Sequence, residues 1–305
     1  MKKINVSIIL LTLNGGEKFR KVLKMVFKQT YKNFETIIID SSSIDNTLEY
    51  AKRYPIKIFK IPRSDFGHGK TRNLGAKLAR GRYLVYLSQD AIPTDNNWLG
   101  NLLVNLKIEN VAGVFGRQIA NGTANPLDFF NYKEDYPNIR KIFSIKNYEQ
   151  NNVIFSDVNS AVKKSVILKY PYPENIPVGE DMGWAIDIIK KNYKLIYEPT
   201  AVVIHSHKFS LINTFKIYFD QGVSFTQIYQ QGNSTYLMLN NKRKFINKIK
   251  YLFKNHKYLW ILISLVTDTI KLLSLMLGKH YQKLPIFLIK HFSDYPNYWV
   301  QIRKY

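Results

Sequence analysis

Residues 6–13 read VSIILLTL and residues 35–40 read ETIIID, and these two stretches decide the fold. Both are short, apolar and rich in β-branched side chains, which is typical of strands buried on both faces of a parallel sheet. The turn residues Asn14-Gly15-Gly16 close the first stretch. Five apolar residues then recur at helical spacing: Phe19, Val22, Leu23, Val26 and Phe27. The chain therefore begins with a β-α-β unit.

The alternation of helices and strands continues along the chain. Asp45 is suited to cap a helix, and the pattern predicts further elements at 46–53 (helix), 56–61 (strand), 69–79 (helix), 82–88 (strand), 96–107 (helix) and 111–119 (strand). Residues 121–156 show no regular pattern. Beyond them we expect a helix over 179–193, strands at 195–197 and 201–205, and a helix over 211–231. This order predicts a doubly wound α/β sheet that binds ligands at the carboxyl ends of its strands.

Composition limits the classes of function. The 305 residues carry a net charge of +23, but 46% of them are apolar, which argues against a disordered chain. The absence of cysteine excludes disulfides, thiolate zinc sites and cysteine nucleophiles. The excess positive charge favours an anionic partner: nucleic acid, an anionic membrane surface or a phosphorylated substrate.

The charge is concentrated in the C-terminal tail. Residues 236–305 hold 13 Lys or Arg residues against Asp268 and Asp294, a net charge of +11. The apolar run 258–277 is long enough to cross a membrane, but it carries a polar stripe: Ser264, Thr267, Asp268, Lys271 and Ser274. We expect an amphipathic helix lying in the plane of a membrane, with the basic block 242–257 facing anionic headgroups. A helix packed on the rest of the protein, or on another subunit, is the alternative.

Two segments at strand ends are candidate nucleotide contacts. Thr12 and Asn14 follow the first strand, and Asp40 ends the second, where a carboxylate can bind a ribose or base or can simply cap a helix. Neither a Gly-x-Gly-x-x-Gly motif nor a P-loop is present. The segment FGHGKTRN (66–73) opens a helix and offers an anion site, or else a capped helix with surface charges.

Two further segments carry acids and imidazoles. Ser88-Gln89-Asp90 follows the fourth strand, where a carboxylate can meet a divalent cation. Glu180-Asp181 begins a helix, where adjacent acids are also common as caps. His205 and His207 end a strand and offer an imidazole ligand, with a pair of surface histidines as the alternative.

Together, the order and spacing of these segments resemble the inverting family-2 glycosyltransferases with a GT-A fold. FGHGKTRN and SQDA (88–91) are similar to bacterial rhamnosyltransferases of O-antigen and capsule assembly. The resemblance covers residues 4–230 and implies a GT-A-like domain over 1–235, with 236–305 as a basic helical tail.

Carried onto this chain, the resemblance implies a role for each matched residue. Asp181 is the catalytic base, with Glu180 and Trp184 on the acceptor side. Asp90 and His205, with His207 as its competitor, bind Mg²⁺ or Mn²⁺. The donor-binding set is Thr12, Asn14, Asp40, Arg72, Gln89 and Asp90, with Arg72 beside the diphosphate. Ser88 replaces the first acid of the family's Asp-x-Asp motif, which leaves one carboxylate for the cation.

The resemblance implies an enzyme that transfers L-rhamnose from dTDP-L-rhamnose, a nucleotide-sugar donor, to a lipid-linked saccharide at the cytoplasmic face of the bacterial plasma membrane. A UDP-hexose donor is the alternative within the family. A basic nucleic-acid-binding protein is a distant third, because the charge lies on the tail and no RNA- or DNA-binding motif is present.

Overall fold

The computed structural model describes residues 4–148, 153–206, 210–228 and 234–302. The chain forms two compact units. The sheet unit comprises 1–121, 136–174 and 180–206, and the helical unit comprises 122–135, 175–179 and 207–305. The division differs from the sequence-based boundary at residue 235, because the segments 122–135 and 210–228 pack with the tail.

A single mixed sheet organises the sheet unit. Its strands are β1 (Val6–Thr12), β2 (Phe34–Asp40), β3 (Ile56–Lys60), β4 (Tyr83–Leu87), β5 (Ile92–Pro93), β6 (Val111–Ile119), β7 (Lys141–Phe143), β8 (Asn159–Lys163) and β9 (Lys194–Ile204). Their order is β3-β2-β1-β4-β8-β6-β9-β5, and β7 also pairs with β9. Strands β3, β2, β1 and β4 are parallel, whereas β8 runs antiparallel to both β4 and β6. The predicted doubly wound mixed sheet is confirmed.

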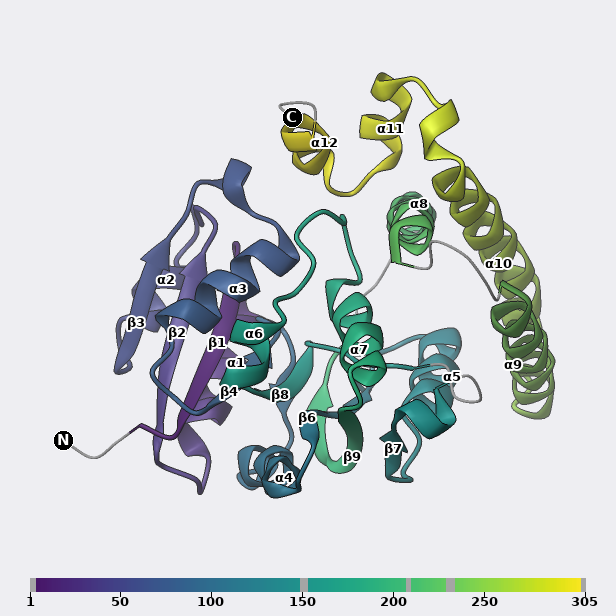
Figure 1. Cartoon of the computed structure of the whole chain (residues 1–305). Coiled ribbons are helices and arrows are strands. Elements are labelled where there is room, and N and C mark those ends of the chain that lie inside the picture. The colour runs from purple at the N-terminus through teal and green to yellow at the C-terminus, as the bar shows by residue number, and fades with distance from the viewer. Residues whose placement is uncertain (1–3, 149–152, 207–209, 229–233, 303–305) are drawn as a thin grey trace. The chain divides into compact units, whose positions relative to one another are not determined.

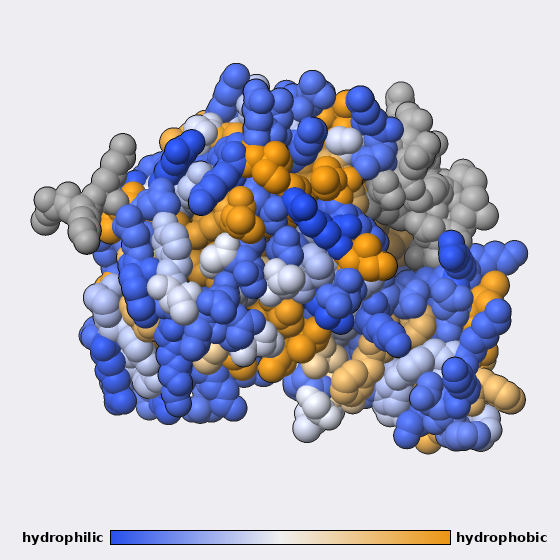
Figure 2. Space-filling model, turned by 90° about the horizontal axis from the view of Figure 1, so that it is seen from below, coloured by the Kyte–Doolittle hydropathy of each residue, from blue (hydrophilic) through white to orange (hydrophobic). Residues whose placement is uncertain are grey.

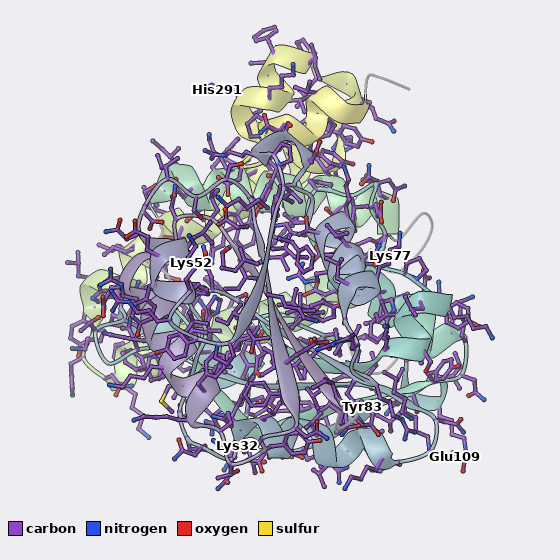
Figure 3. All side chains as sticks on the ribbon, turned by 90° about the vertical axis from the view of Figure 1, so that its left-hand side faces the viewer. Lys32, Lys52, Lys77, Tyr83, Glu109 and His291 are labelled. Atoms are coloured by element: carbon purple, nitrogen blue, oxygen red, sulfur yellow. The ribbon has the colours of Figure 1, made fainter. Side chains whose placement is uncertain are left out.

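Helices cover both faces of this sheet. They are α1 (Gly16–Lys28), α2 (Thr47–Ala51), α3 (His68–Leu78), α4 (Trp98–Val104), α6 (Lys164–Lys169) and α7 (Glu180–Lys190), with short 3₁₀ turns η1 (Arg63–Asp65), η2 (Asn105–Lys107) and η3 (Ile145–Asn147). Figure 3 looks onto the β3 edge and shows Lys52, which follows α2, and Lys77 of α3 on opposite sides of the strands.

Alternation along each strand divides the core into two layers. Val6, Ile8 and Leu10 of β1 pack with α1, α2 and α4, whereas Ile9 packs on the other face with α3, α6 and α7. A strand buried on both faces in this way needs an almost continuous apolar sequence, which is what VSIILLTL supplies. On the face shown in Figure 2, hydrophilic residues surround separate hydrophobic patches.

Most predicted elements agree with the structure to within a few residues. The strands expected at 195–197 and 201–205 are one strand, β9. The irregular region 121–156 contains α5 (Pro126–Asp135), β7 and η3, which the sequence did not reveal. The later elements β8 and α6 were also missed.

The helical unit is built around an apolar helix, α10 (Tyr258–Lys279). Its other elements are α5, α8 (Leu211–Ile228), α9 (Ser234–Lys254), η4 (Tyr281–Lys283), α11 (Ile286–Phe292) and α12 (Pro296–Ile302). Helix α10 lies against α8 (Figure 1), and the contact is so close that a Cβ on Gly278 would lie 2.0 Å from the carbonyl oxygen of Phe219. By length and composition α10 is able to cross a membrane.

The polar stripe of α10 faces protein instead of water. Ser264 and Ser274 are fully buried, Asp268 forms an ion pair with Lys248 of α9, and the Lys271 ammonium lies over the Tyr218 ring of α8. The apolar residues face outward: Leu259, Leu262, Leu265, Val266, Leu272, Leu273 and Met276. The polar stripe that led us to expect an in-plane amphipathic helix therefore packs on α8 and α9, as in the alternative of a helix packed on the rest of the protein.

Candidate active site

The candidate site lies at the edge of the sheet unit where β1, β2, β4 and β9 end. Strand β8 contributes to the same edge because it is antiparallel to β4: Leu87 pairs with Asn159, and the Ser88 N–H donates to the Val158 carbonyl at 3.0 Å. The residues just before β8 therefore lie beside those just after β4. This edge is the usual ligand-binding position in an open α/β sheet.

Asp40 joins the ends of β1 and β2. The Thr12 hydroxyl donates to its Oδ1 at 3.1 Å, and Ser43 donates to the carboxylate through both its backbone N–H (2.9 Å) and its hydroxyl (2.5 Å). Asp40 is fully buried. The structure thus brings Thr12 and Asp40 together, as the sequence predicted, and gives Asp40 a part in holding the loop after β2.

Asn14 locks that loop to the loop after β1. Its backbone N–H donates to Ser43 Oγ, and its Oδ1 accepts from the Ile44 N–H, each at 2.9 Å. Its φ of 48° lies in the left-handed region, which asparagine adopts more readily than most residues. The geometry accounts for an asparagine at this position.

The Gln89 side chain makes two hydrogen bonds to the backbone just after β1. Its side-chain Oε1 accepts from the Leu13 N–H at 3.0 Å, and its Nε2 donates to the Leu13 carbonyl at 3.2 Å. Gln89 therefore ties the segment after β4 to the segment after β1. In this arrangement the side-chain amide of Gln89 holds the loops of the site together.

Asp90 and His205 form a candidate cation site. Asp90 Oδ1 lies 3.6 Å from His205 Nε2, and Lys18 Nζ of α1 lies 3.8 Å from Asp90 Oδ2. Asp90 follows β4 and His205 follows β9, so residues 115 positions apart meet at this edge of the sheet. His207 lies outside the described residues.

A neighbouring amide fixes the orientation of the His205 ring. His205 Nδ1 lies 2.9 Å from Gln118 Oε1, and Gln118 Nε2 donates to Tyr136 Oη and Ser156 Oγ. Gln118 therefore presents its oxygen to the imidazole, which favours the neutral tautomer with its proton on Nδ1 and turns Nε2 toward Asp90. A metal-binding histidine is commonly held in this way. A carboxylate and an imidazole lone pair facing each other fit a divalent cation such as Mg²⁺ or Mn²⁺.

Three carboxylates and one guanidinium form a buried cluster at the start of α7. Asp157, Glu180 and Asp181 offer carboxylate oxygens that all lie within 4.8 Å of one another. Arg72 of α3 reaches Asp157 Oδ2 with its Nε at 3.2 Å and donates to Glu180 through Nη1. Asp181 is half-buried and accepts from the backbone N–H groups of Asp157 (3.1 Å) and Met182 (2.8 Å).

Burial changes the acidity of this cluster. It raises the pKa of Asp157 to about 7 and that of Asp181 to about 6, and the adjacent Glu180 carboxylate adds to the second shift. A carboxylate with a pKa near 6 is ionised at neutral pH and holds an incoming proton better than an ordinary aspartate does. Asp181 therefore has the protonation behaviour of a general base.

Arg72 and Trp184 lie elsewhere than the sequence analysis expected. Arg72 is 9% exposed and is engaged with two carboxylates, so its charge neutralises the acid cluster and is not presented at the cation site. Trp184 is 1% exposed, packs on Phe155 and donates to the Tyr170 carbonyl, because α7 turns this side chain into the core. Glu180 is buried against Arg72, a position that supports its neighbour Asp181.

The segment FGHGKTRN has a local structural task. A Cβ on Gly69 would lie 2.1 Å from the Pro173 carbonyl oxygen, so only glycine permits this approach. Asn73 exchanges hydrogen bonds with the Tyr172 backbone, donating to its carbonyl and accepting from its N–H, both at 3.0 Å. The segment thus fastens α3 to the chain that leads toward α7.

Sequence reasoning missed Asp157, Lys18 and Gln118. Asp157 lies in the stretch before an unrecognised strand, so no pattern placed it at the edge of the sheet. Lys18 is one of many lysines, and Gln118 sits within a predicted strand. A prediction of β8 as an antiparallel neighbour of β4 would have found Asp157.

Comparison with known proteins gives concordant results. Residues 7–170 match the model of the family described as "Glycosyl transferase family 2". The chain is 33% identical to the O-antigen chain rhamnosyltransferase RfbN of Salmonella typhimurium over 98% of each chain. It is 35% identical to the O-antigen chain rhamnosyltransferase WbaN of Salmonella anatum, over 97% of this chain and 96% of that one.

Among solved structures, the fold matches a mannosyltransferase from Pyrobaculum calidifontis in complex with GDP-Man and Mn²⁺. The TM-score is 0.64 at 17% identity, covering 92% of this chain and 88% of that one. The Staphylococcus aureus protein TarS (1–349, in complex with UDP-GlcNAc) gives a TM-score of 0.55 at 14% identity, covering 98% and 92%.

Proposed function

This chain belongs to glycosyltransferase family 2 and has the GT-A fold, and from that premise we propose that it transfers L-rhamnose, with inversion, from dTDP-L-rhamnose to a lipid-linked saccharide in O-antigen synthesis. The observation that carries the proposal is Asp181. It combines a partly buried carboxylate, two backbone hydrogen bonds and a pKa of about 6 at the ligand-binding edge of the sheet. The choice of rhamnose is supported by two relatives that match over almost their full length.

Asp181 serves the acceptor in this mechanism. As the acceptor oxygen attacks the anomeric carbon, its proton passes to the Asp181 carboxylate, and the bond from that carbon to the diphosphate oxygen breaks on the opposite face. One displacement of this kind inverts the configuration. Arg72 is a positioning residue. Its guanidinium pairs with Glu180 and Asp157, and this positive charge offsets the repulsion among the carboxylates around Asp181.

The donor is held by the loops after β1, β2 and β4. Asn14 lies in the loop that contacts the nucleoside, the buried Thr12 and Asp40 hold that loop and the loop after β2 in place, and Gln89 sets the spacing of the loops through Leu13. Asp90 and His205 would hold Mg²⁺ or Mn²⁺, and such a cation would supply positive charge that stabilises the leaving diphosphate. Lys18, beside Asp90, adds a fixed positive charge from the protein itself.

We further propose that the helical unit seats the enzyme on the cytoplasmic face of the plasma membrane. The outward side of α10 is apolar apart from the exposed Thr269, and Leu259 and Leu262 are more than half exposed. Such a surface is stable against hydrocarbon. A lysine stands at each end of the helix: Lys257 at its start and Lys279 at its end. Long cationic side chains at these positions reach anionic headgroups.

A panel of nucleotide sugars tests the donor assignment. Purified protein with membrane-extracted acceptor is expected to consume dTDP-L-rhamnose at least tenfold faster than UDP-glucose, UDP-galactose or GDP-mannose. Faster use of a UDP-hexose supports the alternative donor and refutes the rhamnose assignment. Salt-sensitive binding to nucleic acid without binding to anionic vesicles would refute the membrane assignment.

A further inference from the structure

A basic groove lies between α5 and α9 within the helical unit. It encloses about 240 Å³ and is lined by Lys133 of α5 and by Lys250 and Lys254 of α9. Phe130 and Tyr251 meet there with ring centroids 5.4 Å apart, which gives the groove an apolar wall. Among the described residues that line it, three lysines outnumber the acid Glu134, so this lining carries a net positive charge.

Among the described residues, the three groove lysines differ from their neighbours because they have no ion-pair partner. Lys244 is paired with Asp135 at 2.7 Å, and Lys248 with Asp268 at 2.5 Å. Within the described part of the chain, Lys133, Lys250 and Lys254 form no ion pair. Lys250 and Lys254 are also four residues apart on one helix, where like charges repel. An anion between them relieves that repulsion.

The position of the groove relative to α9 and α10 indicates which kind of anion it binds. Lys250, Tyr251 and Lys254 occupy the last two turns of α9, and α10 begins at Tyr258, after a connection of three residues. The groove therefore lies near the end of α10 that carries Leu259 and Leu262 on its outward, apolar side. A lipid whose acyl chains contact that side would have its headgroup near this level.

We propose that the groove of Lys133, Lys250 and Lys254 binds the phosphate of an anionic phospholipid headgroup at the membrane surface. The proposal rests on the membrane seat described under the proposed function. It assigns to three lysines a specific task that the basic block 242–257 as a whole does not have, because Lys244 and Lys248 are already paired within the protein.

Vesicle sedimentation of the full-length chain tests the site. Phosphatidylcholine vesicles with and without phosphatidylglycerol are compared for the wild type and for the triple variant Lys133→Gln, Lys250→Gln, Lys254→Gln. Each lysine near an anionic surface contributes about fivefold to binding, so the triple variant is expected to lose about a hundredfold on phosphatidylglycerol vesicles and almost nothing on pure phosphatidylcholine.

The matched control is Lys32→Gln, Lys52→Gln, Lys77→Gln, which removes the same charge from exposed positions of the sheet unit (Figure 3). We expect it to lose less than threefold. Equal losses in the two triple variants would show diffuse charge attraction and overturn the site. A groove variant that binds as well as the wild type would overturn it too.

Two further results separate this proposal from the membrane seat. A wild type that binds phosphatidylcholine vesicles but gains nothing from phosphatidylglycerol keeps the seat and overturns the groove, whereas a wild type that binds neither overturns both. Inorganic pyrophosphate is the soluble probe. Tight, lysine-dependent binding of pyrophosphate without any phosphatidylglycerol effect would assign the groove to a diphosphate and overturn the headgroup assignment.

Discussion

The backbone N–H of Asp157 donates to Asp181 Oδ2 at 3.1 Å, so a residue two positions before β8 holds the carboxylate at the start of α7. The Met182 N–H holds the other oxygen at 2.8 Å. Two backbone bonds fix the Asp181 carboxylate, and the residue stays partly accessible to solvent. This is a suitable arrangement for a base that must meet a substrate hydroxyl.

Replacing Asp181 with Asn should abolish transfer without preventing donor binding. A general base contributes about 10²- to 10⁴-fold to the rate, so kcat should fall in that range, with the Kd for nucleotide within a few fold of the wild type. Asp187→Asn, an exposed position on the same helix, is the control and should keep full activity. Normal turnover by the Asp181 variant would remove it as the base.

The pH profile should report the raised pKa of Asp181. A base acts when ionised, so kcat/KM should fall about tenfold per pH unit below about pH 6 and level off above it. If Asp181 had an ordinary pKa near 4, kcat/KM would not change with pH until the pH fell to about 4. Initial rates between pH 4.5 and 8.5, at subsaturating acceptor, distinguish the two; a flat profile from pH 5 upward contradicts the assignment.

Removing the Arg72 charge should destabilise the sheet unit. Arg72→Met leaves the buried Asp157 and Glu180 carboxylates without their cation, and breaking such a pair costs about 3–5 kcal/mol of unfolding free energy. The loss should be smaller at pH 5.5 than at pH 8, because protonation of Asp157, whose pKa is already raised to about 7, removes part of the uncompensated charge.

Urea unfolding at the two pH values measures this effect. Lys70→Met, an exposed position on the same helix, is the control and should change stability by less than about 0.5 kcal/mol. If Arg72→Met were as stable as the control, the guanidinium would not be a structural part of the cluster.

Gln118 should affect the metal affinity of the Asp90–His205 site through His205, without contacting the cation itself. Gln118→Leu removes the oxygen that accepts from His205 Nδ1, and loss of such a partner typically costs about 10- to 100-fold in metal affinity. Asp90→Ala should cost more. Mn²⁺ binding followed by electron paramagnetic resonance measures both; affinities unchanged in both variants, with activity indifferent to EDTA, would refute the site.

The first half of the fold could be predicted from the sequence because β1, β2 and β4 are buried on both faces. VSIILLTL and ETIIID have the near-continuous apolar sequence that is typical of strands inside a parallel sheet. Strand β8 (NSAVK) has no such signature: its first two residues are polar, and its burial depends on β4 and β6 on either side. The outward side of α10 was predictable as apolar, but the burial of its polar stripe depends on α8 and α9.

Residues at the ends of parallel strands were also predictable, since the topology fixes where they meet. Thr12 with Asp40, and Asp90 with His205, are brought together in this way. Arg72 was not predictable in the same sense, because whether a helical arginine faces a ligand or a buried acid depends on tertiary packing. Asp157 supplies that acid, and it comes from an element that the sequence did not reveal.

The anomeric configuration of the product tests the central claim most directly. The wild-type enzyme is given nucleotide-sugar donor and acceptor, and the new glycosidic bond is assigned by the one-bond carbon–hydrogen coupling of its anomeric centre. Single displacement with Asp181 as base predicts a configuration opposite to that of the donor, and no product from Asp181→Asn. Retention of the donor configuration would contradict the account.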